Sequence, residues 1–198
     1  PPRSTLFPYT TLFRSHIPNL IVMAPKDGEE LRRAVFTAVG LGKPVAFRYP
    51  RGHCPVVDRR NAPALDIGKC EIVKEGQNLV VVSIGGVFQE ALRAAEALET
   101  KGVSSTLINA RFLKPMDNAI LEHIRRIGKA LVIEENTMIG GFGSGVLEAC
   151  HAEGLTADIR LIGIPDRFIE HGGQEQLRCD CGLNCENIVR MGEKLCKG

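Results

Sequence analysis

The sequence predicts an α/β fold, a mostly parallel β-sheet with helices on both faces. Strands such as LVVVSI (79–84) are uninterrupted apolar runs, which is typical of parallel strands that are buried on both faces. These runs alternate with helical patterns, the order that parallel strands with helical crossovers require. With 198 residues, 44% of them hydrophobic, the chain can bury one ordinary core, or one domain and part of another.

The first predicted elements are a strand, a helix and a second strand. LIVM (20–23) is a short apolar run, and the helical pattern DGEELRRAVFTAVG follows it. Asp27 and Glu30 form a capping-box pair at the start of this helix, and Gly42 follows its end. PVAF, directly before RYPRG (48–52), predicts the second strand.

The alternation of strands and helices continues beyond residue 68. The helix after strand 79–84 carries apolar residues on one face, as expected for a helix that covers a sheet; these are Val87, Ala91, Ala94, Ala95 and Leu98. The remaining predicted elements are strands at 104–109, 130–135 and 159–164, and helices at 117–127, from about 144, and from 184 or 185 to about 195.

Two segments fall outside this pattern. Residues 1–15 contain TLF twice, no acidic residue and no periodicity, so we expect a non-native or disordered leader there. Residues 53–68, with Pro55 and Pro63, predict a linker between domains. The predicted organisation is therefore a leader (1–15), the end of a first domain (16–52), a linker (53–68) and a complete α/β domain (69–198).

Charge and composition exclude several classes of protein. The 25 basic and 23 acidic residues give a net charge of +2, so no charge excess indicates nucleic acid or an anionic membrane as a partner. No apolar stretch approaches the roughly 20 residues that span a bilayer. The seven cysteines show no disulfide pattern, which favours reduced thiols and a cytoplasmic protein.

Several residues with titratable side chains are interpreted as structural. Cys179, Cys181 and Cys185 form a C-x-C-x3-C cluster, whereas zinc sites usually pair cysteines as C-x2-C, and no fourth ligand is obvious nearby. Ordinary thiols near a helix start are therefore favoured over a zinc site. His171, before two glycines, is interpreted as a loop residue or a hydrogen-bonding strut.

A glycine-rich loop, GGFGSG (140–145), lies between a predicted strand and a predicted helix. Backbone N–H groups at such a place can bind phosphate, but the loop lacks both a Walker lysine and the G-x-G-x-x-G spacing. Glu134 and Glu135 directly before it would repel an anion, and as strand neighbours they point to opposite faces. Close packing of helix on strand is therefore favoured over a phosphate site, and an acid/base pair is not expected.

The strand end RYPRG carries Arg48 and Arg51. Arginine at a strand end is often only a solvated tip, but two arginines followed by a glycine can form a fork for phosphate or carboxylate. This is the best anion site that the residues alone predict.

Five motifs, in this order, resemble the carboxyl-terminal third of the 1-deoxy-D-xylulose-5-phosphate synthase family, thiamine-diphosphate enzymes of the transketolase superfamily. They are IPNLIVMAPKDGEEL (17–31), FRYPRG (47–52), NARFLKPMD (109–117), VIEENTMIGGFGSGV (132–146) and LIGIPDRFIEHGGQEQL (161–177). RYPRG together with GIPDRFIEHG is the most specific combination. Transketolases and the β subunits of 2-oxoacid dehydrogenases are similar in fold.

The resemblance implies a reaction and a role for one residue. Pyruvate condenses with glyceraldehyde 3-phosphate, with loss of carbon dioxide, to give a precursor of isoprenoids, thiamine and pyridoxal. Arg51 would bind the phosphate of glyceraldehyde 3-phosphate. Arg48 would serve packing or a salt bridge, with a substrate contact as the less favoured role.

The resemblance also implies a place for each segment. Residues 16–52 would end a pyrimidine-binding domain, and residues 69–198 would form the third domain, at the interface of a homodimer. The family's main binding residues for thiamine diphosphate and Mg²⁺ belong to segments that match no part of this sequence. We therefore expect no synthase activity from this chain by itself. The alternatives are a stand-alone module that binds phosphate or nucleotide, a dimerisation domain, or another enzyme of the superfamily.

Overall fold

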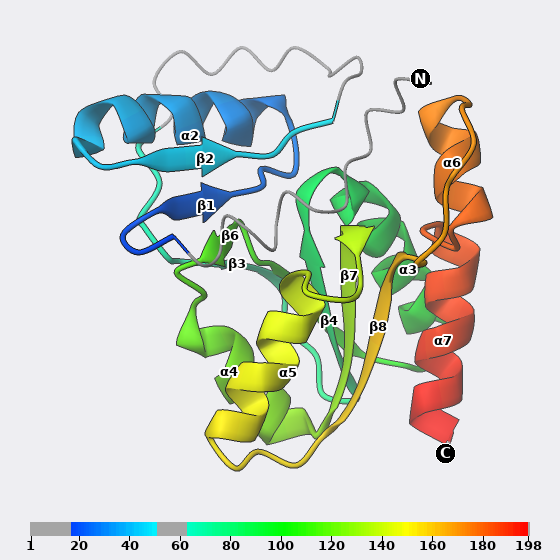
Figure 1. Cartoon of the computed structure of the whole chain (residues 1–198). Coiled ribbons are helices and arrows are strands. Elements are labelled where there is room, and N and C mark those ends of the chain that lie inside the picture. Colours follow the sequence, from blue (N-terminus) through cyan, green and yellow to red (C-terminus); the bar gives the residue numbers. More distant parts are fainter. Residues whose placement is uncertain (1–16, 51–62, 198) are drawn as a thin grey trace.

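The computed structural model describes residues 17–50 and 63–197, which form two β-sheets with flanking helices (Figure 1). The elements are β1 (Ile21–Met23), α2 (Gly28–Leu41), β2 (Val45–Phe47), β3 (Glu71–Lys74), β4 (Leu79–Ile84), the 3-10 turn η1 (Gly85–Val87), α3 (Phe88–Thr100), β5 (Ser105–Asn109), β6 (Phe112–Lys114), α4 (Asn118–Ile127), β7 (Lys129–Thr137), α5 (Phe142–Ala152), β8 (Asp158–Ile164), α6 (Gln174–Asp180) and α7 (Cys185–Lys197). The predicted leader 1–15 and most of the predicted linker 53–68 lie outside the described residues.

The larger sheet has five strands in the order β3-β5-β4-β7-β8. Strands β5, β4, β7 and β8 are parallel, and only the edge strand β3 is antiparallel to its neighbour. Every residue of β4 and β5 is buried, which explains why β4 is almost entirely apolar. The predicted α/β fold class is confirmed.

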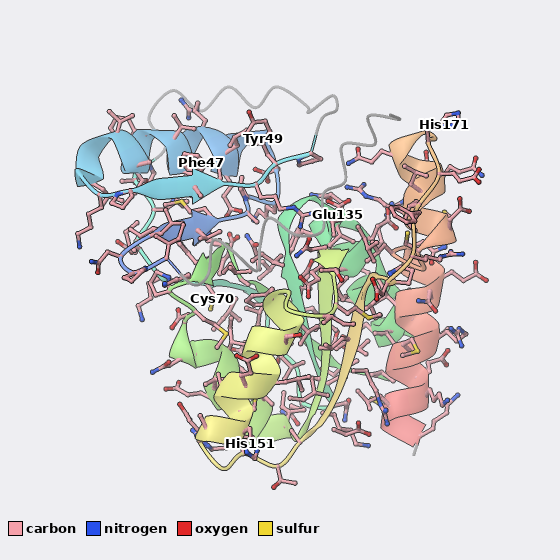
Figure 2. The ribbon with its side chains drawn as sticks, viewed as in Figure 1. Phe47, Tyr49, Cys70, Glu135, His151 and His171 are labelled. Atoms are coloured by element: carbon pink, nitrogen blue, oxygen red, sulfur yellow. The ribbon has the colours of Figure 1, made fainter. Side chains whose placement is uncertain are left out.

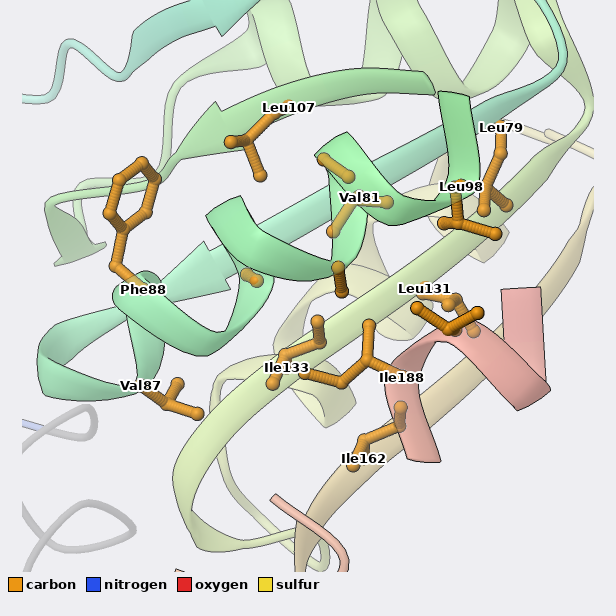
Figure 3. Close-up of a cluster of buried hydrophobic side chains, with 14 of the residues drawn as sticks. Leu79, Val81, Val87, Phe88, Leu98, Leu107, Leu131, Ile133, Ile162 and Ile188 are labelled. Atoms are coloured by element: carbon orange, nitrogen blue, oxygen red, sulfur yellow. The ribbon is translucent and has the colours of Figure 1, made fainter. Parts of the chain in front are cut away.

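Helices cover both faces of this sheet. Helices α3 and α7 pack on one face over the cluster of apolar side chains that Figure 3 shows, and α4 and α5 pack on the other. Because side chains of a strand alternate between faces, Leu79 and Val81 contact the α3 side, whereas Val80 and Val82 contact the α4 side. The apolar face predicted for the α3 helix is buried as expected.

The order of the connections creates a crevice at one edge of this sheet. Strand β4 continues into η1 and α3 on one face, and its neighbour β7 continues into α5 on the opposite face. The segments that follow β4 and β7 therefore separate beyond the carboxyl ends of these two strands. In open α/β sheets such a point is where ligands usually bind.

The smaller sheet combines β1 and β2, which precede the predicted linker, with β6, which follows it. The strand order is β2-β1-β6. Strands β1 and β2 are parallel, and β6, which follows β5, pairs antiparallel with β1. Helix α2 begins as predicted, because the Asp27 side chain accepts a hydrogen bond from the Glu30 N–H at 2.8 Å. It ends at Gly42, whose φ of 59° lies in the left-handed region that favours glycine.

A buried polar network connects α2 to the larger sheet. The Glu30 carboxylate, which is 3% exposed, accepts hydrogen bonds from Asn109 Nδ2 at 2.9 Å and from Arg111 Nε at 2.6 Å. Arg111 and Lys26 both pair with Glu71 on β3. This network fixes the position of α2, and with it the end of β2, relative to the larger sheet.

Candidate functional site

The first residues of RYPRG lie over the carboxyl edge of the larger sheet. The Arg48 N–H donates to the Met23 carbonyl at 2.8 Å, which extends the pairing of β1 with β2. The Arg48 guanidinium donates to the backbone carbonyl of Glu135 on β7. The strand end is thereby attached to the crevice between β4 and β7.

Arg51, the residue for which a phosphate contact is predicted, lies outside the described residues. The structure describes RYPRG as far as Pro50. The substrate contacts predicted for Arg51 and Arg48 therefore remain predictions.

A cavity of about 510 Å³ lies between the end of β2 and the crevice. Two charged side chains meet in it, because Arg178 Nε on α6 donates to Glu135 Oε1 at 2.5 Å. Figure 2 shows Glu135 near the end of β7, below Tyr49 of the segment that follows β2. The apolar part of the wall consists of Ala24, Phe47, Ile84, Ile164, Leu177 and Leu183.

Gly86 in η1 keeps this cavity open. A Cβ at this position would lie 3.0 Å from Glu135 Oε2 and 3.1 Å from both Arg178 Nη2 and Pro50 Cγ. Those distances are shorter than ordinary van der Waals contacts, so a larger residue would displace the ion pair. Steric crowding thus explains why the second residue after β4 is a glycine.

The GGFGSG loop binds a carboxylate of its own chain. Glu134 Oε2 accepts the N–H of Phe142 at 2.8 Å, and Oε1 accepts the N–H of Gly143 at 2.9 Å. A Cβ at Gly141 would lie 2.3 Å from Glu134 Oε2. The amide groups that would hold a phosphate are thus occupied, and the packing interpretation of these glycines is favoured over a phosphate site.

Burial governs the protonation of Glu134. Loss of solvation raises the pKa of its carboxyl to about 7, against the opposing effect of the two amide donors and of Arg48. Glu135 points to the opposite face of the sheet and meets Arg178 instead. The two glutamates therefore form no acid/base pair, as the alternation of strand side chains predicted.

Of the histidine and cysteines singled out in the sequence, only Cys181 is among the described residues that line this cavity. His171 and Cys179 are exposed, and burial raises the pKa values of the Cys181 and Cys185 thiols. Within residues 17–50 and 63–197 no group of three His, Cys, Asp or Glu side chains could hold a metal ion. Asn184 Oδ1 accepts the N–H of Asn187 at 3.1 Å and so caps α7.

Sequence reasoning missed Arg178 and Gly86, which complete the cavity. Arg178 lies 43 residues from Glu135 in the chain, and its helix α6 has only seven residues. A pair that forms through tertiary contact leaves no spacing signal in one sequence. The glycine pair after β4 was a visible signal, but its steric role required the position of Arg178.

A mostly parallel sheet with helices on both faces and a crevice at its switch point defines an open α/β domain, and family comparison shows which kind it is. The family model described as "Transketolase, C-terminal domain" matches residues 68–188, so this chain belongs to that family. Within the described residues, no helix is long and apolar enough to cross a membrane.

Curated proteins similar to this chain include 1-deoxy-D-xylulose-5-phosphate synthases. The chain is 42% identical to the synthase of Aquifex aeolicus over 183 residues, which is 92% of this chain and 29% of the relative. It is 44% identical to synthase 1 of Geobacter sulfurreducens over 181 residues, which is 90% of this chain and 28% of the relative. The chain thus spans less than a third of these relatives, and the resemblance predicted from the motifs is confirmed.

Solved structures support the same fold. A structure described as "Split gene transketolase, inactive beta4 tetramer" is 27% identical with a TM-score of 0.81, and it covers 94% of this chain and 61% of its own. The transketolase of Campylobacter jejuni has a TM-score of 0.68 at 19% identity, over 92% of this chain and 27% of that one. The second likeness concerns the fold alone.

Proposed function

We propose that this chain is part of a 1-deoxy-D-xylulose-5-phosphate synthase, which condenses pyruvate with glyceraldehyde 3-phosphate and releases carbon dioxide. The observation that carries the proposal is identity of 42% to the Aquifex aeolicus synthase over 92% of the chain. Two of the motifs that carry the resemblance also lie close together in space. Arg48 and Pro50 of RYPRG and Ile164 and Gly172 of LIGIPDRFIEHGGQEQL all border the same cavity.

In this proposal Arg51 binds the phosphate of glyceraldehyde 3-phosphate. A guanidinium presents paired N–H donors to phosphate oxygens, which gives both attraction and orientation. Support comes from the fixed position of the preceding residues, since Arg48 is held by hydrogen bonds to Met23 and Glu135. Arg48 then has a positioning role for the loop, and a direct substrate contact remains its alternative role.

The cofactor belongs to another part of the proposed enzyme. The described residues offer no cluster of His, Cys, Asp or Glu side chains for a metal ion, so they do not fit the site of thiamine diphosphate with Mg²⁺. We derive no catalytic step through that cofactor from this chain. A homodimer, a cytoplasmic location and the domain limits 16–52, 53–68 and 69–198 are parts of the same proposal.

The experiment that tests the proposal restores the missing length. Residues 17–198 would be joined to the part of the Aquifex aeolicus synthase that precedes its match to this chain. We expect the chimera to form 1-deoxyxylulose 5-phosphate from both substrates with thiamine diphosphate and Mg²⁺. A chimera that folds and assembles like the Aquifex enzyme but forms no product would contradict the proposal.

A further inference from the structure

We propose that the cavity between β2 and the crevice of the larger sheet binds a small organic phosphate through Arg178. The inference goes beyond the proposed function because it names a different residue, a different element and a separate ligand contact. It depends on the described residues only. Its test, given below, separates it from the contact proposed for Arg51.

The position of the cavity favours a ligand. It lies beyond the carboxyl ends of β4, β7 and β8, where the helices that follow β4 and β7 run to opposite faces. A crevice at such a switch point is the usual ligand site of open α/β sheets. Its volume of about 510 Å³ lies within the range of small-molecule sites.

Arg178 is held in a geometry suited to an anion. Its side chain is 20% exposed, and only its Nε is engaged, by Glu135 Oε1 at 2.5 Å. The other N–H groups of its guanidinium have no hydrogen-bond partner among the described residues. A carboxylate that orients the guanidinium from one edge leaves the other edge free to bind two phosphate oxygens.

The rest of the described lining suits an organic phosphate. Among the described residues that line it, Arg48 and Glu135 accompany Arg178. The Arg48 guanidinium donates to the backbone carbonyl of Glu135, and the Glu135 carboxylate accepts a hydrogen bond from Arg178. The apolar residues of the lining suit the carbon skeleton of an organic phosphate better than inorganic phosphate alone.

The test is calorimetric titration of the 198-residue chain with phenyl phosphate, with phenol as the uncharged control. We expect saturable binding of phenyl phosphate that Arg178→Gln weakens about tenfold or more. Gly86→Val should weaken it too, because the added side chain would occupy space beside Glu135. The matched control is Arg160→Gln, because Arg160 also pairs with a carboxylate, Asp158, but at the amino end of β8. Arg160→Gln should bind like the unaltered chain.

Several results would overturn the inference. They are the absence of saturable binding, equal binding of phenol and phenyl phosphate, or binding that survives Arg178→Gln. If Arg51→Gln abolishes binding while Arg178→Gln preserves it, the phosphate occupies the place proposed for Arg51, and only the present inference fails. If Arg178→Gln does not fold, as judged by circular dichroism, Arg178→Lys and Gly86→Val decide the question, and unchanged binding in both overturns it.

Discussion

Glu134 determines the role of the most conspicuous glycine loop in the sequence. Its carboxylate occupies the N–H groups of Phe142 and Gly143 at the start of α5, and Gly141 provides the space for it. A loop that would otherwise attract a phosphate is satisfied internally. The sequence favoured this outcome through the two acidic residues before the loop, although it did not identify which of them binds.

The buried Glu134 carboxyl should make stability depend on pH. Its pKa is about 7 in the folded protein against an ordinary value of 4.5, so the folded state binds more protons than the unfolded state between these values. The free energy of unfolding should therefore fall as the pH rises from about 4.5 to 7, by up to about 3 kcal/mol. Urea unfolding of the chain at pH 5 and at pH 7.5 measures this fall.

The matched variants for that experiment lie on one helix and the strand before it. Glu134→Gln should abolish most of the fall, because the amide does not titrate, whereas Glu148→Gln should preserve it because Glu148 is exposed on α5. An equal pH dependence in the Glu134→Gln variant and the unaltered chain would show that another group is responsible.

Arg51 is the residue on which substrate recognition depends in the proposed function. In the chimera with the Aquifex aeolicus relative, we expect Arg51→Ala to lower kcat/KM for glyceraldehyde 3-phosphate by about 10- to 150-fold. This corresponds to the roughly 1.5–3 kcal/mol of a charge-assisted hydrogen bond. The KM for pyruvate should change little. Steady-state kinetics with each substrate varied in turn checks this, and an unchanged dependence on the aldehyde would remove the assignment.

At the scale of elements, the central strands, the long helices and the short strands β1 and β2 were predictable, whereas three other short elements were not. Strand β4 and helices α2 and α3 follow from apolar runs, helical periodicity and a capping box, since local patterns specify them. Helix α5 begins at Phe142 rather than near residue 144, because the Glu134 carboxylate caps a glycine-rich turn. Strands β3 and β6 and helix α6 were missed, because they depend on pairing or docking with distant segments.

The network around Glu30 gives a prediction about how elements are held together. Glu30→Ala should lower the free energy of unfolding by about 3–5 kcal/mol, because it leaves the Arg111 guanidinium buried with one carboxylate fewer. Glu99→Ala is the matched control, since Glu99 pairs with Lys74 on the surface and should cost at most about 1 kcal/mol. Equal losses in the two variants, measured by urea unfolding, would contradict a special role for the network.

The candidate site combines one part that the sequence indicated and one part that it did not. RYPRG stood out because two arginines follow a strand end, and a family resemblance gave it a meaning. The ion pair of Glu135 with Arg178 forms between β7 and the short helix α6, so only the folded structure brings its members together. The sequence motifs therefore indicated which edge of the sheet carries the site. The cavity itself forms only through tertiary packing of α6 against β7.

At the scale of the whole molecule, this chain spans about 29% of its Aquifex aeolicus relative, and the described part offers no metal cluster. We expect the purified 198-residue chain to form no 1-deoxyxylulose 5-phosphate when it is supplied with both substrates, thiamine diphosphate and Mg²⁺. The full-length Aquifex enzyme serves as the positive control under the same conditions. Turnover by the chain alone would show that it contains a complete active site.

The central claim is that residues 17–198 supply phosphate recognition to a 1-deoxy-D-xylulose-5-phosphate synthase. The most direct measurement is the acceptor selectivity of the chimera, the ratio of kcat/KM for glyceraldehyde 3-phosphate to that for unphosphorylated glyceraldehyde. The account predicts a strong preference for the phosphorylated acceptor in the chimera, reduced in its Arg51→Ala variant. A chimera that uses both acceptors equally well, or whose preference is the same with alanine at position 51, would contradict it.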